Sequence, residues 1–331
     1  MTVKITIVGM GQIGTSVGLA LAEKTDLVYR VGHDRELKIA QQAQKMGALD
    51  KVSINLPSAV SEADLVLLSL PTDQIRETMS VIAADLKEGA VVMDTAPVKE
   101  VVLSWAREFL TNGRYYVGLT PVINPIYLQN HDSGIEAAHA DLFRGGMMAI
   151  VASPPTPSEA IKLASDLTRL LGSTPLFADP VEVDSLMAAT HILPQLLAAA
   201  LLNSTVDQPG WREARKLAGR AFAEVTGPIV QLGEPEALCS AAMLARDNVL
   251  RVTDSVIAAL QAFRNDIKNQ EDKALTQRLE RARNGRERWW IERQAANWAA
   301  EDGASDVEAP KASEIFGRLI GLGRKPKPKN L

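Results

Sequence analysis

The fold is decided by one stretch near the amino terminus, residues 3–14, which reads VKITIVGMGQIG. Its first six residues form a short, mostly β-branched apolar run, which is typical of a buried strand. Its last six form a G-x-G-x-x-G element that contains Gly9, Gly11 and Gly14. Residues 15–24 then have the apolar spacing of an amphipathic helix, so the glycines lie where a strand turns into a helix.

Each residue type in this turn suits a phosphate site. Gly9 permits a tight turn, Gly11 lets the backbone approach a pyrophosphate, and Gly14 lets the helix pack closely on the strand. Gln12 and Ile13 complete the loop. Because the amino end of a helix favours negative charge, the pattern predicts a Rossmann domain in which these five residues bind NAD or NADP.

The second apolar run ends close to Asp34, which lies 20 residues beyond Gly14. A carboxylate at this place accepts hydrogen bonds from the adenosine ribose and repels a 2′-phosphate, which favours NAD. Arg35 follows directly and could pair with a 2′-phosphate, so NADP stays open. The alternative role for Asp34 is that of an ordinary turn or helix-capping residue.

A third group of candidate cofactor residues, Leu70, Pro71 and Thr72, closes another apolar run. We expect them at the carboxyl edge of the sheet, beside a ribose of the cofactor. The alternative is that Pro71 merely begins the next connection.

Short apolar runs alternate with helical stretches from residue 3 to about residue 153, which is typical of parallel strands joined by helices. Strands are expected at residues 3–8, 27–32, 65–70, 90–94, 115–119 and 147–152. After a proline-rich stop the pattern is helical, and no further strand is expected. We predict an α/β protein: a doubly wound parallel sheet in a Rossmann domain (1–153), an all-α dimerisation and substrate domain (154–302), and a flexible C-terminal tail (303–331).

The composition narrows the function classes. A chain of 331 residues with 46% hydrophobic and 23% charged residues is expected to be soluble and to have two domains. The net charge of −4 argues against a nucleic-acid partner. Cys239 is the single cysteine, which fits the reducing cytoplasm, and neither a leader, a membrane span nor a metal-ligand cluster is expected.

Four further segments carry a second signal: DTAPVK at 94–99, GLTP at 118–121, DPVEVD at 179–184 and MAATHILPQL at 187–196. Over roughly residues 1–265 the chain resembles the prephenate/arogenate dehydrogenase family of tyrosine biosynthesis. The resemblance implies an NAD(P)-dependent oxidoreductase that takes a hydride from a cyclohexadienol, or a related hydroxyacid, with oxidative decarboxylation. It also implies a homodimer formed through the helical domain.

The resemblance also shows departures from the family pattern. Thr120 stands at the position of the family's catalytic histidine, and a threonine hydroxyl is far too weak a base to replace imidazole. Pro97, Gly227 and Val183 stand where the family has a serine, a substrate-binding arginine and a histidine. The sequence is therefore interpreted as a divergent member of the family.

The remaining candidate acid/base is His191, which an extra Ile192 puts one residue out of register with the family's Ser-His-Leu-Pro signature. We predict His191 and Thr120 as the catalytic residues, with a satisfied core histidine as the alternative for His191. Lys99 and Asn124 are predicted to hold a substrate oxygen, and a plain solvent-exposed role is the alternative for each.

Two other functions stay open at this stage. The lost family residues favour a non-catalytic NAD(P)-binding sensor of the same fold. A β-hydroxyacid dehydrogenase-like reductase would instead need a helical-domain lysine where residues 188–191 read AATH. The apolar patch and basic end at 315–329 are interpreted as a docking segment or a flexible tail, and the apolar helices at 193–202 and 249–260 predict a homodimer.

Overall fold

The computed structural model describes residues 2–295, except 112, 131, 155 and 231–233. The described chain divides into two compact units after Val183, and each unit is described here by itself. The predicted tail at 303–331 lies outside the described residues.

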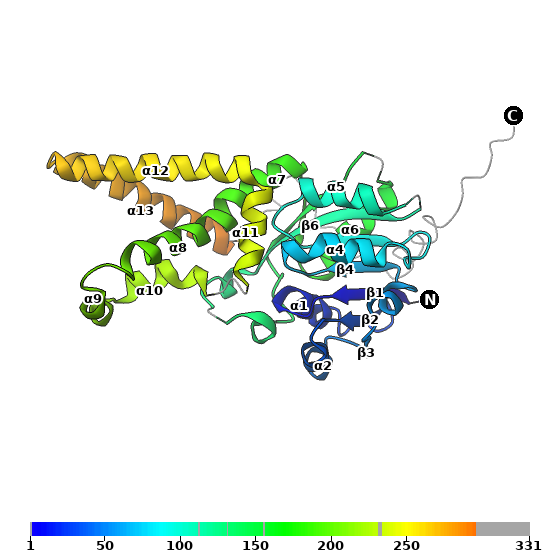
Figure 1. Ribbon diagram of the computed structural model, residues 1–331. Helices are drawn as coiled ribbons and strands as arrows, with labels where there is room; N and C mark the ends of the chain where they lie inside the picture. Colours follow the sequence, from blue (N-terminus) through cyan, green and yellow to red (C-terminus); the bar gives the residue numbers. More distant parts are fainter. Residues whose placement is uncertain (1, 112, 131, 155, 231–233, 296–331) are drawn as a thin grey trace, which may run out of the picture. The chain divides into compact units, whose positions relative to one another are not determined.

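The first unit is built on one eight-stranded sheet with the order β3-β2-β1-β4-β5-β6-β7-β8 (Figure 1). Neighbouring strands are parallel except β6 and β7, which pair antiparallel. The strands are β1 (Val3–Val8), β2 (Val28–His33), β3 (Lys51–Val52), β4 (Leu65–Leu68), β5 (Val91–Asp94), β6 (Tyr115–Val122), β7 (Met147–Val151) and β8 (Thr174–Phe177).

Helices cover both faces of this sheet. The helices of the first unit are α1 (Gln12–Ala20), α2 (Leu37–Lys45), α3 (Leu56–Val60), α4 (Thr72–Ile82), α5 (Glu100–Phe109) and α6 (Ser158–Leu170), with short turns η1 (Pro125–Tyr127) and η2 (Gly134–Ala137). One buried cluster joins Leu65 and Leu67 of β4 to apolar residues of α1, α2 and α6. Because side chains alternate along a strand, the buried Val66 and Leu68 face the opposite side, where α4 and α5 lie next to each other.

The doubly wound sheet is confirmed, but three expectations were wrong. β3 and β8 were missed, β8 because Thr174–Phe177 is a short, half-buried strand at the sheet edge. β7 is antiparallel to β6, and the described part of residues 123–146 between them contains only the short turns η1 and η2. The domain boundary at residue 153 is too early, because α6 and β8 complete the sheet and the first unit continues to Val183.

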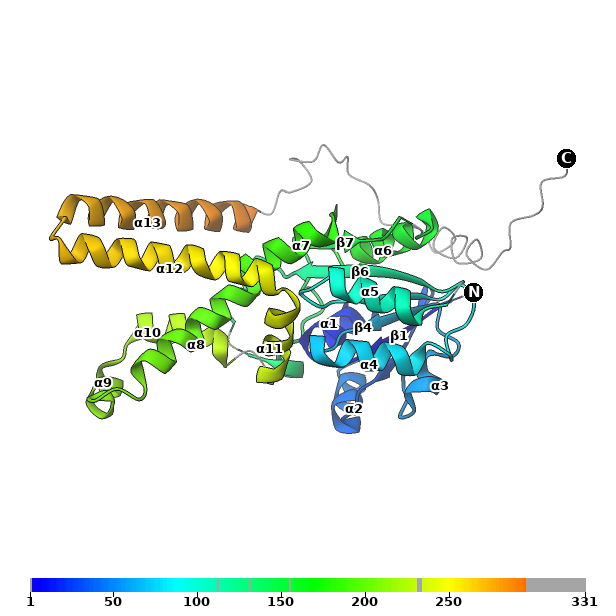
Figure 2. The same ribbon diagram turned by 45° about the horizontal axis from the view of Figure 1, so that its top comes forward.

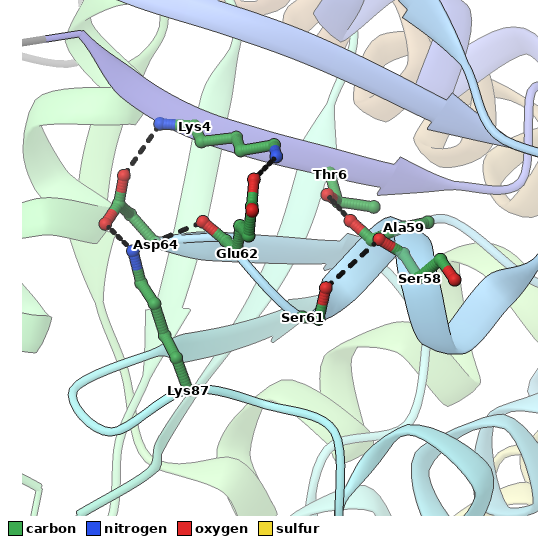
Figure 3. A network of polar contacts seen from close by, with 8 residues as sticks. All are labelled: Lys4, Thr6, Ser58, Ala59, Ser61, Glu62, Asp64 and Lys87. Carbon is green, nitrogen blue, oxygen red and sulfur yellow. Dashed lines mark hydrogen bonds and ion pairs between the residues drawn. The ribbon is translucent and has the colours of Figure 1, made fainter.

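The amino-terminal ends of β1 and β4 are joined by charged side chains (Figure 3). The backbone N–H of Lys4 donates to Asp64 Oδ2 at 2.7 Å, and Lys87 pairs with the other oxygen of the same carboxylate. The Lys4 ammonium pairs with Glu62. These contacts set the register of β1 on β4 at the edge opposite the glycine turn.

The second unit is helical. Its elements are α7 (Pro180–Met187, which begins in the first unit), the π turn η3 (Ala188–Ile192), α8 (Leu193–Thr205), α9 (Trp211–Leu217), α10 (Arg220–Thr226), η4 (Gly227–Ile229), α11 (Pro235–Leu244), α12 (Arg246–Lys268) and α13 (Asp272–Ala295). α12 and α13 form an antiparallel hairpin (Figure 2), which Arg278 and the buried Asp266 join at 2.6 Å. By length and mean hydropathy alone the helical run Pro180–Thr205 could cross a membrane.

A buried guanidinium fastens the first two helices to the sheet. Arg30 on β2 donates to both oxygens of Asp50, at 2.7 and 3.1 Å, and to the carbonyl oxygens of Gly18 and Gly47. The hydrogen bond from Arg30 outweighs desolvation and holds the pKa of the Asp50 carboxyl below its ordinary value.

We predict that Asp50→Asn lowers the free energy of unfolding at neutral pH by about 1.5–3 kcal/mol, the usual contribution of a hydrogen bond to a charged group. Because the folded-state pKa is depressed, the stabilisation is present above the unfolded pKa of roughly 4 and is lost as the pH falls through the folded value. Urea unfolding across this range should show the difference from wild type shrinking in acid. Glu77→Gln, at an exposed carboxylate on α4, is the control; a pH-independent difference for Asp50→Asn would contradict this assignment.

Candidate functional site

The glycine turn joins β1 to α1, and two of its glycines are required by the fold itself. Gly9 has a φ of +93°, and a Cβ there would lie 2.2 Å from the carbonyl oxygen of Ser69. A Cβ on Gly14 would lie 2.0 Å from the carbonyl oxygen of Gly9. Any larger residue at either position would therefore push β1, β4 and α1 apart.

Gly11 is different, because no packing contact with the described residues requires a glycine there. Its φ of −74° and ψ of −160° suit other residues, and a Cβ would meet no atom within 4 Å. It caps the amino end of α1, where backbone N–H groups await acceptors. The bare, open backbone at this helix end fits the diphosphate of a dinucleotide.

Asp34 lies beside this turn at the end of β2. Its Oδ2 accepts the backbone N–H of Met10 at 2.8 Å, and its Oδ1 accepts that of Glu36 at 2.9 Å. The bond to Glu36 is the turn role that the sequence left open, while the bond to Met10 holds the carboxylate against the glycine turn. Arg35 is exposed and next to it in the chain.

The end of β4 meets the glycine turn from the other side. The N–H of Ser69 donates to Val8 at 2.8 Å, and a Cβ on Gly9 would lie 2.9 Å from Leu70 Cδ2. Pro71 is exposed and caps the amino end of α4, and Thr72 is buried in its first turn. Pro71 therefore begins the next helix and lies at the predicted edge as well.

The two middle residues of the turn are held by the protein. Gln12 donates its side-chain amide to the carbonyl oxygen of Ala137 at 3.2 Å, and Ile13 packs on the hydrophobic core. All ten predicted cofactor residues thus lie at one edge of the sheet, on the turns that follow β1, β2 and β4 or in the first turns of the helices α1 and α4.

Lys99, which was predicted to bind the substrate, pairs with a carboxylate of the protein. Its side chain is 0% exposed, and Nζ donates to Asp94 Oδ2 at 2.7 Å. The same carboxylate accepts the Tyr116 hydroxyl and the backbone N–H of Ala96. Substrate binding by Lys99 stays a prediction, and it requires this buried pair to open.

Thr120 lies near the carboxyl end of β6, and Asn124 lies two residues beyond that end. The Asn124 amide is engaged locally, because Oδ1 accepts from Ile126 and Nδ2 donates to Asp141, both at 3.2 Å. Thr120 is 3% exposed, and its hydroxyl has no hydrogen-bond partner among the described residues. A buried hydroxyl without a partner is costly, and a bound ligand would remove that cost at Thr120.

His191 lies in the π turn η3 of the second unit. A π turn is the usual way in which a helix absorbs one added residue, and it coincides with the extra Ile192 relative to the family signature. Gln195 donates to the His191 carbonyl oxygen at 2.7 Å. His191 is exposed, and desolvation by surrounding protein atoms lowers the pKa of its imidazole.

A cavity of about 200 Å³ lies away from this edge, at the start of β6 and the end of α5. Leu103, Arg107, Tyr115 and Tyr116 are among its lining residues. This cavity is not the dinucleotide site, because the glycine turn lies at the carboxyl ends of the parallel strands and the cavity lies at the start of β6. Within the described ranges no group of three or more metal-ligating side chains gathers.

Comparison with known proteins identifies the family. Residues 17–174 match the nucleotide-binding domain of prephenate dehydrogenase, and residues 179–281 match the prephenate dehydrogenase dimerization domain. The chain belongs to the prephenate dehydrogenase family. The predicted family, the predicted NAD(P) cofactor and the predicted dehydrogenase class are thereby confirmed.

Full-length relatives agree with this assignment. The cyclohexadienyl dehydrogenase of Zymomonas mobilis is 25% identical over 284 residues, which cover 85% of this chain and 94% of that protein. The prephenate dehydrogenase of Bacillus subtilis is 22% identical over 86% of this chain and 75% of its own length.

Solved structures confirm the fold of the family. A prephenate dehydrogenase from A. aeolicus, in complex with hydroxyphenyl propionate and NAD⁺, superposes with a TM-score of 0.76 at 20% identity, covering 87% of this chain and 98% of that one. Synechocystis arogenate dehydrogenase superposes with a TM-score of 0.67 at 22% identity, over 86% and 99%.

Sequence reasoning missed two polar residues of the first unit. Asp94 was noticed as part of a motif but not as the acceptor that organises the turn after β5. A carboxylate that ends a fully apolar strand is a usable signal, since it must find partners when buried. Tyr116 carries no such signal, because its partner is 22 residues away on a neighbouring strand.

We predict that Gly11→Val abolishes NAD binding while the protein stays folded, because the new side chain fills only space that a ligand would occupy. Isothermal titration calorimetry measures the affinity, and thermal unfolding checks the fold. Gly285→Ala in α13 is the matched control, since a Cβ there also meets nothing within 4 Å. It should stabilise the helix by up to about 1 kcal/mol without changing NAD affinity. Unchanged affinity in Gly11→Val would refute the assignment of this turn.

Proposed function

We propose that the enzyme oxidises a cyclohexadienol carboxylate, prephenate or arogenate, with loss of CO₂, and that it does so in the cytoplasm. The hydride leaves the carbinol carbon, a base takes the hydroxyl proton, and the departing carboxylate leaves its electron pair in the ring, which becomes aromatic. The nicotinamide, when bound, accepts the hydride. The observation that carries the proposal is the open turn at Gly11 in a chain whose two units both match this family.

Three residues of this chain are proposed to bind the substrate, accept its proton and select the cofactor. The Thr120 hydroxyl has no partner among the described residues, which supports a role in holding the substrate hydroxyl, since it can both donate and accept a hydrogen bond. His191 is the proposed base: its lowered pKa keeps the imidazole neutral near pH 7, the form that accepts a proton. Asp34 supports NAD as the preferred cofactor.

The test supplies the purified protein with NAD or NADP and with prephenate or arogenate, and follows the absorbance of the reduced nicotinamide. We expect turnover with one of the four combinations. Tight cofactor binding without turnover would overturn the enzyme proposal and favour the non-catalytic sensor. Thr120 and Pro97, which stand at positions where the family resemblance implies a histidine and a serine, are the residues that suggest this alternative.

In the same assay we predict that His191→Ala lowers kcat by about 10²- to 10⁴-fold, the usual contribution of a general base. Thr190→Ala, in the same helical turn and also exposed, is the control and should keep full activity. A His191→Ala enzyme with the wild-type kcat would remove His191 from the mechanism.

We also propose that the second unit joins two copies of this chain into a homodimer. α12 exposes Leu250, Ile257 and Leu260, by 49%, 47% and 59% respectively, and their spacing of seven and three residues puts them on one side of the helix. This stripe belongs to the part of the chain that matches the dimerization domain. A second copy of the same stripe is the economical cover for it.

We predict that Ile257→Glu with Leu260→Glu yields a monomer, because two carboxylates would be buried unpaired in the interface. Sedimentation velocity gives the mass in solution. Ile54→Glu, at an exposed apolar residue of the first unit, should leave the dimer intact. A double variant that remains dimeric would place the interface elsewhere.

A further inference from the structure

Three polar side chains are buried together beneath the turn that follows β5. Asp94 and Lys99 are both 0% exposed, and Tyr116 is buried beside them. Asp94 Oδ2 accepts from Lys99 Nζ and from the backbone N–H of Ala96, each at 2.7 Å, while Oδ1 accepts from the Tyr116 hydroxyl. The Asp94 carboxylate thus connects β5 to β6, to Ala96 in the turn and to Lys99 at the start of α5.

The sheet makes room for this group at one position. A Cβ on Gly118 would lie 2.9 Å from Lys99 Cδ and 2.9 Å from the Tyr116 hydroxyl oxygen. Gly118 pairs directly with Asp94 across β5 and β6. A glycine here is what lets the two side chains reach the carboxylate.

Stability alone does not explain such a group. Removing a carboxylate and an ammonium from water costs several kcal/mol, and apolar side chains of similar volume usually stabilise a core at least as well. What a fully bonded polar group adds is a defined geometry. Here the hydrogen bond from the backbone N–H of Ala96 to Asp94 fixes the conformation of residues 95–98.

The position of this turn connects it with the cofactor. β5 lies between β4 and β6, with Leu68, Asp94 and Gly118 in register. A dinucleotide in a doubly wound sheet extends across the carboxyl ends of the strands from the switch point near β1. Since Asp34 marks the adenosine side at β2, residues 95–98 lie on the nicotinamide side.

We propose that Asp94, Lys99 and Tyr116 are positioning residues that set the backbone of residues 95–98 against the nicotinamide half of the cofactor. Lys99 acts through Asp94 in this role. The inference rests on the cofactor site and not on the identity of the substrate, so its test needs no turnover.

Tyr116→Phe is the decisive variant, because it removes one hydroxyl and keeps the ring. It leaves Asp94 Oδ1 without that donor and loosens the turn. We expect the affinity for NADH to fall about tenfold, the effect of one hydrogen bond to a charged group. The affinity for ADP-ribose, which lacks the nicotinamide, should stay within about twofold of wild type. Calorimetric titration measures both.

Tyr115→Phe is the matched control, since Tyr115 is the neighbouring tyrosine and the hydroxyl that donates to Asp94 is that of Tyr116. It should change neither affinity. Thermal unfolding of both variants shows whether the fold is kept.

Three results would overturn the proposal. Equal losses for NADH and ADP-ribose in Tyr116→Phe would show a merely structural role, and unchanged NADH affinity would show no role at all. If wild-type protein bound neither probe, the cofactor site would itself be wrong, and the positioning role would fall with it.

Discussion

The structure of the first unit depends on the close approach of two peptide groups, those of Gly9 and Ser69. A Cβ on Gly9 would lie 2.2 Å from the Ser69 carbonyl oxygen, so the ends of β1 and β4 meet only because one of them has no side chain. The same turn starts α1 at Gln12 and directs its amino end along the strand ends. The anion-binding property of that helix end follows from this one packing constraint.

The two edges of the sheet are specialised for different work. At the amino edge, Lys4, Glu62, Asp64 and Lys87 satisfy each other in exposed or half-exposed ion pairs that join β1 to β4 (Figure 3). At the carboxyl edge, Asp34 and Asp94 accept backbone N–H groups and hold turns in place. Charge is thus used at the first edge for register and at the second for the shape of a binding surface.

The two candidate catalytic side chains belong to different units of the protein. Thr120 lies near the carboxyl end of β6, and its buried hydroxyl has no hydrogen-bond partner among the described residues. In the second unit, His191 lies in the π turn at Ala188–Ile192, which connects α7 to α8. In both cases a regular element fixes the backbone from which the candidate side chain extends.

The sequence by itself determined six of the eight strands of the first unit, the turn at Gly9–Gly14, the helical second unit and the cofactor class, because these depend on contacts between residues near one another in the chain. Its local patterns did not reveal β8 or the reversed β7, since the pairing of an edge strand depends on partners distant in sequence. Tertiary structure alone decided that Lys99 pairs with Asp94, that Tyr116 joins them, and that Asn124 caps a turn. The physical reason is that burial makes a polar side chain take whichever partner the fold brings within reach, and a residue pattern records the side chain without recording that partner.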